Sequence, residues 1–179
     1  AGAAMRFSFA ALTVSGAAAF SATPTVNLVA EFFVPYFDFM GALSPSGKVL
    51  VSGKDDPAVV DVQFSLSGLD PACINGRNTS LSANSCGVHV HKGTDCAKSA
   101  EGHYWVDPVT EDPWTQHVHY TYSTAEPIEG HADQSFMVGG APDALLGRTL
   151  IIHAYNGTRV ACAILMPEML DCMTASGPC

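Results

Sequence analysis

Apolar and polar positions alternate along several short segments of the chain, a pattern that predicts β-strands. The clearest case is residues 59–67, where Val60, Val62, Phe64 and Leu66 are separated by polar residues. Successive side chains of a strand point to opposite faces, so this segment is predicted to be half-buried. Other segments rich in β-forming residues predict strands at residues 26–33, 47–53, 87–92, 117–123, 132–138, 149–153 and 159–166.

Glycine, proline and asparagine separate these segments, and no stretch after the N-terminal leader keeps a helical period. Residues 70–85 are polar, and residues 98–116 are irregular and rich in proline, which predicts loops in both places. About eight short strands joined by such turns predict an all-β fold, an antiparallel eight-stranded Greek-key barrel or sandwich.

The first 22 residues have the features of a signal peptide. A methionine and an arginine at positions 5 and 6 precede an apolar run, and small residues follow it at positions 17–22. The run is too short for a comfortable transmembrane helix, and no other segment could span a bilayer. We therefore expect residues 1–22 to be a leader, residues 23–170 one secreted domain, and residues 171–179 a C-terminal tail.

Composition sets limits on the partners. Of the 179 residues, 47% are hydrophobic and 14% are charged, so a sizeable core can form, and the net charge is −9. This negative charge, without any basic run, argues against nucleic acids and anionic membranes as partners. Composition leaves the oligomeric state open.

Six cysteines, at positions 73, 86, 96, 162, 172 and 179, predict disulfides and an oxidising compartment. None is spaced Cys-x-x-Cys, which argues against a zinc ribbon or a thioredoxin-type motif. Six cysteines allow fifteen pairings. Cys73 and Cys86 flank one polar loop and could close it, and Cys172 with Cys179 could close the tail.

The histidines suggest a metal site. His89 and His91 are two residues apart on a predicted strand, so their side chains point to the same face. Two imidazoles on one face of a strand favour a ligand pair, although an exposed polar strand face gives the same pattern. His103 and His153 lie downstream as further candidate ligands.

Four motifs occur in a characteristic order: HVHKGTDC at residues 89–96, GHYW at 102–105, GRTLIIH at 147–153 and GTRVAC at 157–162. Together they resemble the copper/zinc superoxide dismutase family, over residues 25–166. The resemblance implies a superoxide dismutase-like fold and superoxide as the substrate. It also implies that copper is bound by His89, His91, His103 and His153.

The resemblance assigns further roles. Arg159 would draw the superoxide anion to the metal, and His103 would leave reduced copper and take up a proton. Cys96 and Cys162 would form the intrasubunit disulfide, and Cys172–Cys179 would then remain as the third pair.

Two departures from the family pattern point to its copper-only branch, extracellular proteins of fungi and oomycetes. His117 and His119 stand at alternate positions without an acidic residue nearby, so the zinc site looks lost and an exposed strand face is favoured. The long loop that the copper/zinc enzymes have before the active-site arginine is reduced here to residues 154–158. Copper without zinc is therefore expected.

The sequence favours a secreted copper-dependent superoxide dismutase that converts superoxide to oxygen and hydrogen peroxide. The alternative is an extracellular copper-binding or structural module with the same fold and little turnover. Arg159 favours the enzyme, because a binding module does not need it. Asn78 and Asn156 begin Asn-x-Ser/Thr sequons and are candidate glycosylation sites.

Overall fold

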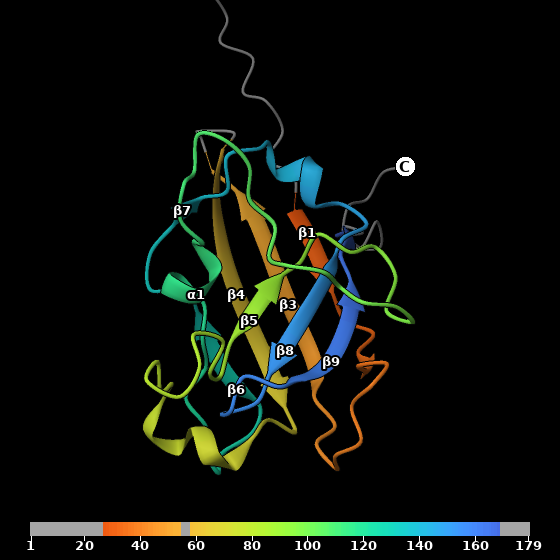
Figure 1. The fold of residues 1–179 in the computed structure, drawn as a ribbon, viewed down its shortest axis with the longest axis vertical. Helices are drawn as coiled ribbons and strands as arrows, with labels where there is room; N and C mark the ends of the chain where they lie inside the picture. Colours follow the sequence, from red (N-terminus) through yellow and green to blue (C-terminus); the bar gives the residue numbers. More distant parts are fainter. Residues whose placement is uncertain (1–26, 55–57, 169–179) are drawn as a thin grey trace, which may run out of the picture.

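The computed structural model describes residues 27–54 and 58–168. It is nearly all β and consists of two antiparallel sheets, with β5, β8 and β9 of one sheet lying over β1, β3 and β4 of the other (Figure 1). The predicted all-β antiparallel fold is confirmed.

The larger sheet has six strands in the order β10-β1-β3-β4-β6, with β7 also paired to β4. Its longest pair, β3 and β4, is joined over eight residue pairs in continuous register. The strands are β1 (Asn27–Ala30), β3 (Ser46–Gly53), β4 (Val59–Ser67), β6 (Ile128–His131), β7 (Phe136–Met137) and β10 (Met166–Pro167).

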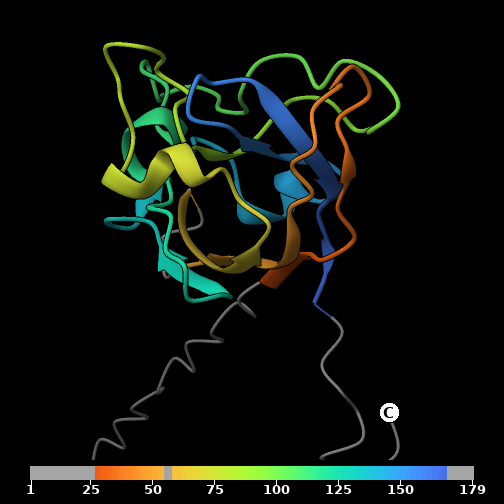
Figure 2. The same ribbon diagram turned by 90° about the horizontal axis from the view of Figure 1, so that it is seen from below.

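The smaller sheet has four strands in the order β2-β9-β8-β5 and carries two of the four candidate ligands, His89 and His153. Figure 2 shows the connection after β1 running beside β9, to which β2 is paired. The strands are β2 (Val34–Pro35), β5 (Val88–Val90), β8 (Thr149–His153) and β9 (Arg159–Ile164).

Helical structure is limited to short turns. The described residues contain the 3-10 helices η1 (Pro71–Asn75) and η2 (Pro142–Leu145) and the α-helix α1 (Trp114–His117). None of these helices is long or apolar enough to cross a membrane.

Apolar side chains from alternate strand positions fill the space between the sheets. Val60, Val62 and Leu66 of β4 are fully buried, whereas Gln63 between them is exposed, as the alternation predicts. All five residues of β8 are buried. A buried aliphatic side chain contributes about 1.5–3 kcal/mol, so β8 gives its last residue, His153, a rigid support.

Two predicted strands are wrong. Residues 117–123 form no strand: His117 ends α1, and the segment beyond it makes only an isolated bridge, between His119 and Gly87. The helix forms because the buried Trp114 anchors a tight turn, after which the chain runs to the Cys73 loop. The predicted strand 132–138 is replaced by β6 and β7, which are separated by a bend.

Two disulfides are present in the described residues. Cys73–Cys86 has an S–S distance of 2.08 Å and Cys96–Cys162 one of 2.05 Å. The first closes the polar loop, and the second ties the loop after β5 to β9. The proposed Cys172–Cys179 pair, the leader 1–22 and the tail 171–179 lie outside the described residues.

Loop length predicts how much each disulfide stabilises the fold. Cross-linking a longer loop removes more entropy from the unfolded chain, and the separations are 66 residues for Cys96–Cys162 and 13 for Cys73–Cys86. Cys96→Ser/Cys162→Ser should lower the free energy of unfolding by about 4 kcal/mol and Cys73→Ser/Cys86→Ser by about 3 kcal/mol. Urea denaturation of metal-free protein measures both, and an unchanged midpoint would contradict the estimate.

Candidate metal centre

Four buried histidines converge on one end of the smaller sheet. His89 lies within β5, His91 directly follows it, and His153 ends the neighbouring β8. His103 comes from the loop beyond, where it forms an isolated bridge with His91. Their side chains are only 0–7% exposed. The four predicted ligands are therefore brought together.

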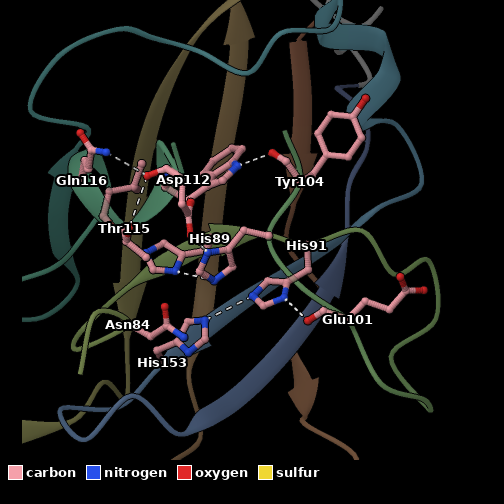
Figure 3. A network of polar contacts seen from close by, with 12 residues as sticks. Asn84, His89, His91, Glu101, Tyr104, Asp112, Thr115, Gln116 and His153 are labelled. Atoms are coloured by element: carbon pink, nitrogen blue, oxygen red, sulfur yellow. Dashed lines mark hydrogen bonds and ion pairs between the residues drawn. The ribbon is translucent and has the colours of Figure 1, made fainter. Parts of the chain in front are cut away.

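Ring nitrogens face one another in two close pairs, and three of the four histidines, His89, His103 and His153, are close enough to share one ion; His91 adjoins this group through His153. His89 Nδ1 lies 3.3 Å from His103 Nε2, and His91 Nε2 lies 3.3 Å from His153 Nε2 (Figure 3). One ring nitrogen from each of His89, His103 and His153 lies within 4.8 Å of the other two.

The other nitrogen of each ring faces an oxygen atom that only accepts hydrogen bonds. Three of these oxygens are backbone carbonyls: Val118 faces His89, Glu101 faces His91 and Gly157 faces His153. The fourth is the carboxylate of Asp112, which faces His103. All four lie 2.5–3.1 Å from the outer ring nitrogen. Each outer nitrogen must therefore carry the hydrogen. The neutral ring then presents a lone pair inward, as metal-ligating histidines do.

Such a donor set fits a cation. Two inward lone pairs 3.3 Å apart cannot hydrogen-bond to each other, whereas a metal ion between them would satisfy both. Imidazole nitrogen suits copper, zinc, iron and nickel. The geometry therefore fits a metal ion but does not distinguish among these metals.

Burial favours the neutral form of three of these imidazoles, those of His89, His91 and His153. Desolvation, and then repulsion from the neighbouring histidines, lowers the pKa of His89 well below its ordinary value. The same causes lower the pKa of His91 to about 2. Burial lowers the pKa of His153 to about 3. A neutral imidazole is the form that binds a metal.

Glycines allow this local geometry at two positions. A side chain on Gly87 would overlap the His89 ring, since its Cβ would lie 2.2 Å from the ring carbon Cε1. Gly157 has φ +81°, a left-handed conformation that glycine adopts readily, in the turn where its carbonyl meets His153.

Asp112 is a site residue that the sequence reasoning missed. One carboxylate oxygen lies 2.5 Å from His103 Nδ1, and the other accepts a hydrogen bond from the Trp114 backbone at 3.0 Å. The indole of Trp114 is fully buried and donates to the Tyr104 carbonyl, which anchors this corner (Figure 3). The only signal was an acidic residue before Pro113-Trp114 in the loop after His103.

Arg159, at the start of β9, lies beside the cluster. Its Nη2 donates to the Glu101 carbonyl, the same oxygen that accepts from His91 Nδ1. Glu101 has φ +60°, which turns this carbonyl toward both partners. Within the described residues no carboxylate forms an ion pair with Arg159, so its positive charge is not neutralised by a direct partner.

His117 and His119 lie outside this cluster. His117 does have an acidic partner, Asp133, whose Oδ1 lies 2.8 Å from Nδ1, so the expectation of no acidic residue in reach is wrong. The partner was missed because it lies 16 residues away in sequence. His119 Nδ1 is buried and has no hydrogen-bond partner among the described residues.

The two sequon asparagines differ in their surroundings. Asn78 is partly buried, and its amide nitrogen donates to Tyr155 Oη at 3.0 Å. Asn156 is exposed in the turn between His153 and Arg159, where its side-chain oxygen accepts from the Thr158 backbone.

The lowered histidine pKa values predict that acid destabilises the metal-free protein. The unfolded chain takes up protons near pH 6.5, whereas folded His153 and His91 do so only near pH 3 and pH 2. Their contribution to stability is therefore full above pH 6.5 and is lost as the pH falls, by roughly 1 kcal/mol per group per pH unit. Urea midpoints at pH 7, 6 and 5 measure the slope.

His91→Gln should flatten this slope, and replacing the exposed His131 by glutamine should leave it unchanged. A midpoint that does not move between pH 7 and pH 5 would contradict the assignment of these buried histidines.

Comparisons with known proteins agree with this architecture. No protein-family model and no curated protein matches the sequence. Solved structures do match, and among them are two of Candida albicans superoxide dismutase 5 that carry different substitutions of one glutamate. Each is 18% identical to this chain, and each alignment covers 86% of this chain. The TM-scores are 0.52 and 0.53, and the alignments cover 100% and 98% of the two matched chains, respectively. At this identity the likeness establishes architecture, and the chain has the superoxide dismutase fold.

Proposed function

We propose that this protein is a copper-only superoxide dismutase that acts outside the cell. The observation that carries the proposal is the unneutralised guanidinium of Arg159 fixed beside four inward-facing imidazoles. A site that only stored a metal would not need an anchored positive charge beside it. Copper bound to His89, His91, His103 and His153 would supply one-electron oxidation and reduction.

Arg159 would bind the substrate. Superoxide is a small anion, and a chain of net charge −9 repels it at long range. This repulsion is screened beyond about 10 Å in ordinary salt, so a local positive group has to supply the final attraction. Arg159 is suited to this because its planar guanidinium can hold an anion in one orientation.

His103 and Asp112 would handle a proton. Turnover of two superoxide ions consumes two protons and yields one oxygen and one hydrogen peroxide. His103 Nε2 faces the centre and can hold one of these protons, while the Asp112 carboxylate stabilises the resulting imidazolium through Nδ1. Asp112 would thus keep His103 in place when its Nε2 carries a proton instead of contacting the metal.

The same contact supports copper without zinc. A bridging imidazole needs both of its nitrogens for metal ions, but His103 Nδ1 is engaged by Asp112. His117 is engaged by Asp133 and does not join the cluster. We propose that Asp112 takes the place that a second metal would have behind His103.

An extracellular location fits the two disulfides and the leader expected at residues 1–22. Of the two sequons, Asn156 is the better candidate for a glycan, because it is exposed while the Asn78 amide is already hydrogen-bonded.

Arg159→Ala tests the activity. The variant should bind as much copper as the wild type but dismutate superoxide at least several-fold more slowly, with a weaker dependence on salt, because the local attraction is lost. Stopped-flow decay of superoxide at several ionic strengths, together with copper analysis, measures this.

Lys92→Ala is the matched control. Lys92 is exposed next to His91 and lies 5.5 Å from the centre of the Trp105 ring, so its loss should change the rate little. An unchanged rate in Arg159→Ala, or copper-loaded wild type without dismutation, would favour the copper-binding module.

Metal content tests the cofactor. Protein exposed to both metals should retain about one copper and far less zinc per chain, because an imidazole site binds Cu²⁺ more tightly than Zn²⁺. His117→Ala/His119→Ala should leave both contents unchanged. Tetrahedral zinc held by His103 with His117 or His119 would overturn the copper-only proposal.

A further inference from the structure

Tyr36 reaches the metal centre from a distant part of the chain. It directly follows the edge strand β2, and its backbone nitrogen donates to the Val160 carbonyl at 2.9 Å. The side chain is only 3% exposed and packs in a small buried cluster with Ala100, Ile151 and Cys162. The residue is thereby attached to β9 immediately beside Arg159.

The Tyr36 hydroxyl joins two segments that flank the site. Its oxygen accepts a hydrogen bond from Arg159 Nη1 at 2.8 Å and another from the Ala100 backbone nitrogen at 3.1 Å. A phenolic oxygen has two lone pairs, and these two donors use both. The ring itself lies 5.5 Å from the Arg159 guanidinium carbon.

Arg159 is consequently held at both of its terminal nitrogens. Nη1 donates to Tyr36, and Nη2 donates to the Glu101 carbonyl, which also receives the His91 hydrogen bond. One contact would leave the guanidinium free to swing about it. Two contacts from one planar fork determine its orientation relative to His91.

We propose that Tyr36 is a positioning residue for Arg159, which fixes the guanidinium beside the histidine cluster where a small anion would meet it. The inference extends the proposed function. Packing alone does not explain the residue, because a phenylalanine ring would fill the same buried space, whereas only the hydroxyl can hold Arg159. Hydrogen bonds to charged groups are the stronger ones, so its loss should be measurable.

Azide titration of the copper-loaded full chain tests the proposal without relying on turnover, because azide is a small anion whose binding to Cu²⁺ changes the absorption spectrum. Tyr36→Phe should keep its copper and bind azide at least about tenfold more weakly, the lower end of the effect of one hydrogen bond to a charged group. Tyr155→Phe is the matched control: it removes a hydroxyl that contacts Asn78 and not Arg159, so its azide affinity should stay within about twofold of wild type.

A double-mutant cycle separates positioning from a general effect on the loop. In the Arg159→Ala background, Tyr36→Phe should cause little further loss, since the residue it positions is gone. A full additional loss would mean that Tyr36 acts through Ala100, and would overturn the proposal. Azide affinity equal to wild type in Tyr36→Phe alone would also overturn it.

If Tyr36→Phe does not bind copper, Arg159→Lys is the variant to titrate with azide. Lysine keeps the positive charge but cannot contact both Tyr36 and Glu101. Azide affinity close to that of Arg159→Ala would support positioning, and wild-type affinity would overturn it. If the variants show this coupling in azide binding but the copper-loaded wild type does not dismutate superoxide, the proposed activity is refuted and the role of Tyr36 is retained.

Discussion

Each histidine of the metal centre is oriented by an oxygen atom on its outer side. These oxygens only accept hydrogen bonds, so they determine which ring nitrogen carries the hydrogen and leave the other available inside. Without them a buried imidazole could rotate or change tautomer, and the four lone pairs would no longer converge. The chain must therefore place the four acceptors, those of Val118, Glu101, Gly157 and Asp112, as accurately as the ligands.

The acceptors all lie in loops or at the ends of elements, and specific contacts hold them there. Burial of Trp114 keeps Asp112 beside His103. The Cys96–Cys162 disulfide ties the loop that contains Glu101 to β9. The two sheets supply a rigid base, and these few contacts transmit that rigidity to the parts that touch the ligands.

Local patterns predicted the long paired strands well and failed where a tertiary contact determines the structure. Residues 59–67 form a strand with the predicted limits, because alternating burial is a property of neighbouring residues. Residues 117–123 alternate too, yet a buried tryptophan three residues before His117 produces a helical turn there instead. The alternation of apolar and polar residues does not reveal a tertiary contact of that kind.

The site was predictable only in part. The four histidines were recognisable because their motifs occur in a familiar order, although no spacing rule alone would unite His89 with His153. Asp112 and Tyr36 were not predictable, since their contacts with His103 and Arg159 depend on the path of loops across 9 and 123 residues. Asp133 escaped notice for the same reason.

The carboxylate behind His103 has a consequence for how such a centre is assembled. A metal ion in that place would be in exchange with the surroundings, and its occupancy would follow the free concentration of the ion and the presence of chelators. Asp112 belongs to the chain and cannot dissociate, and its second oxygen is engaged by the Trp114 backbone. The orientation of His103 is therefore established by folding, and under the proposed copper-only function the mature centre would depend on the supply of a single ion.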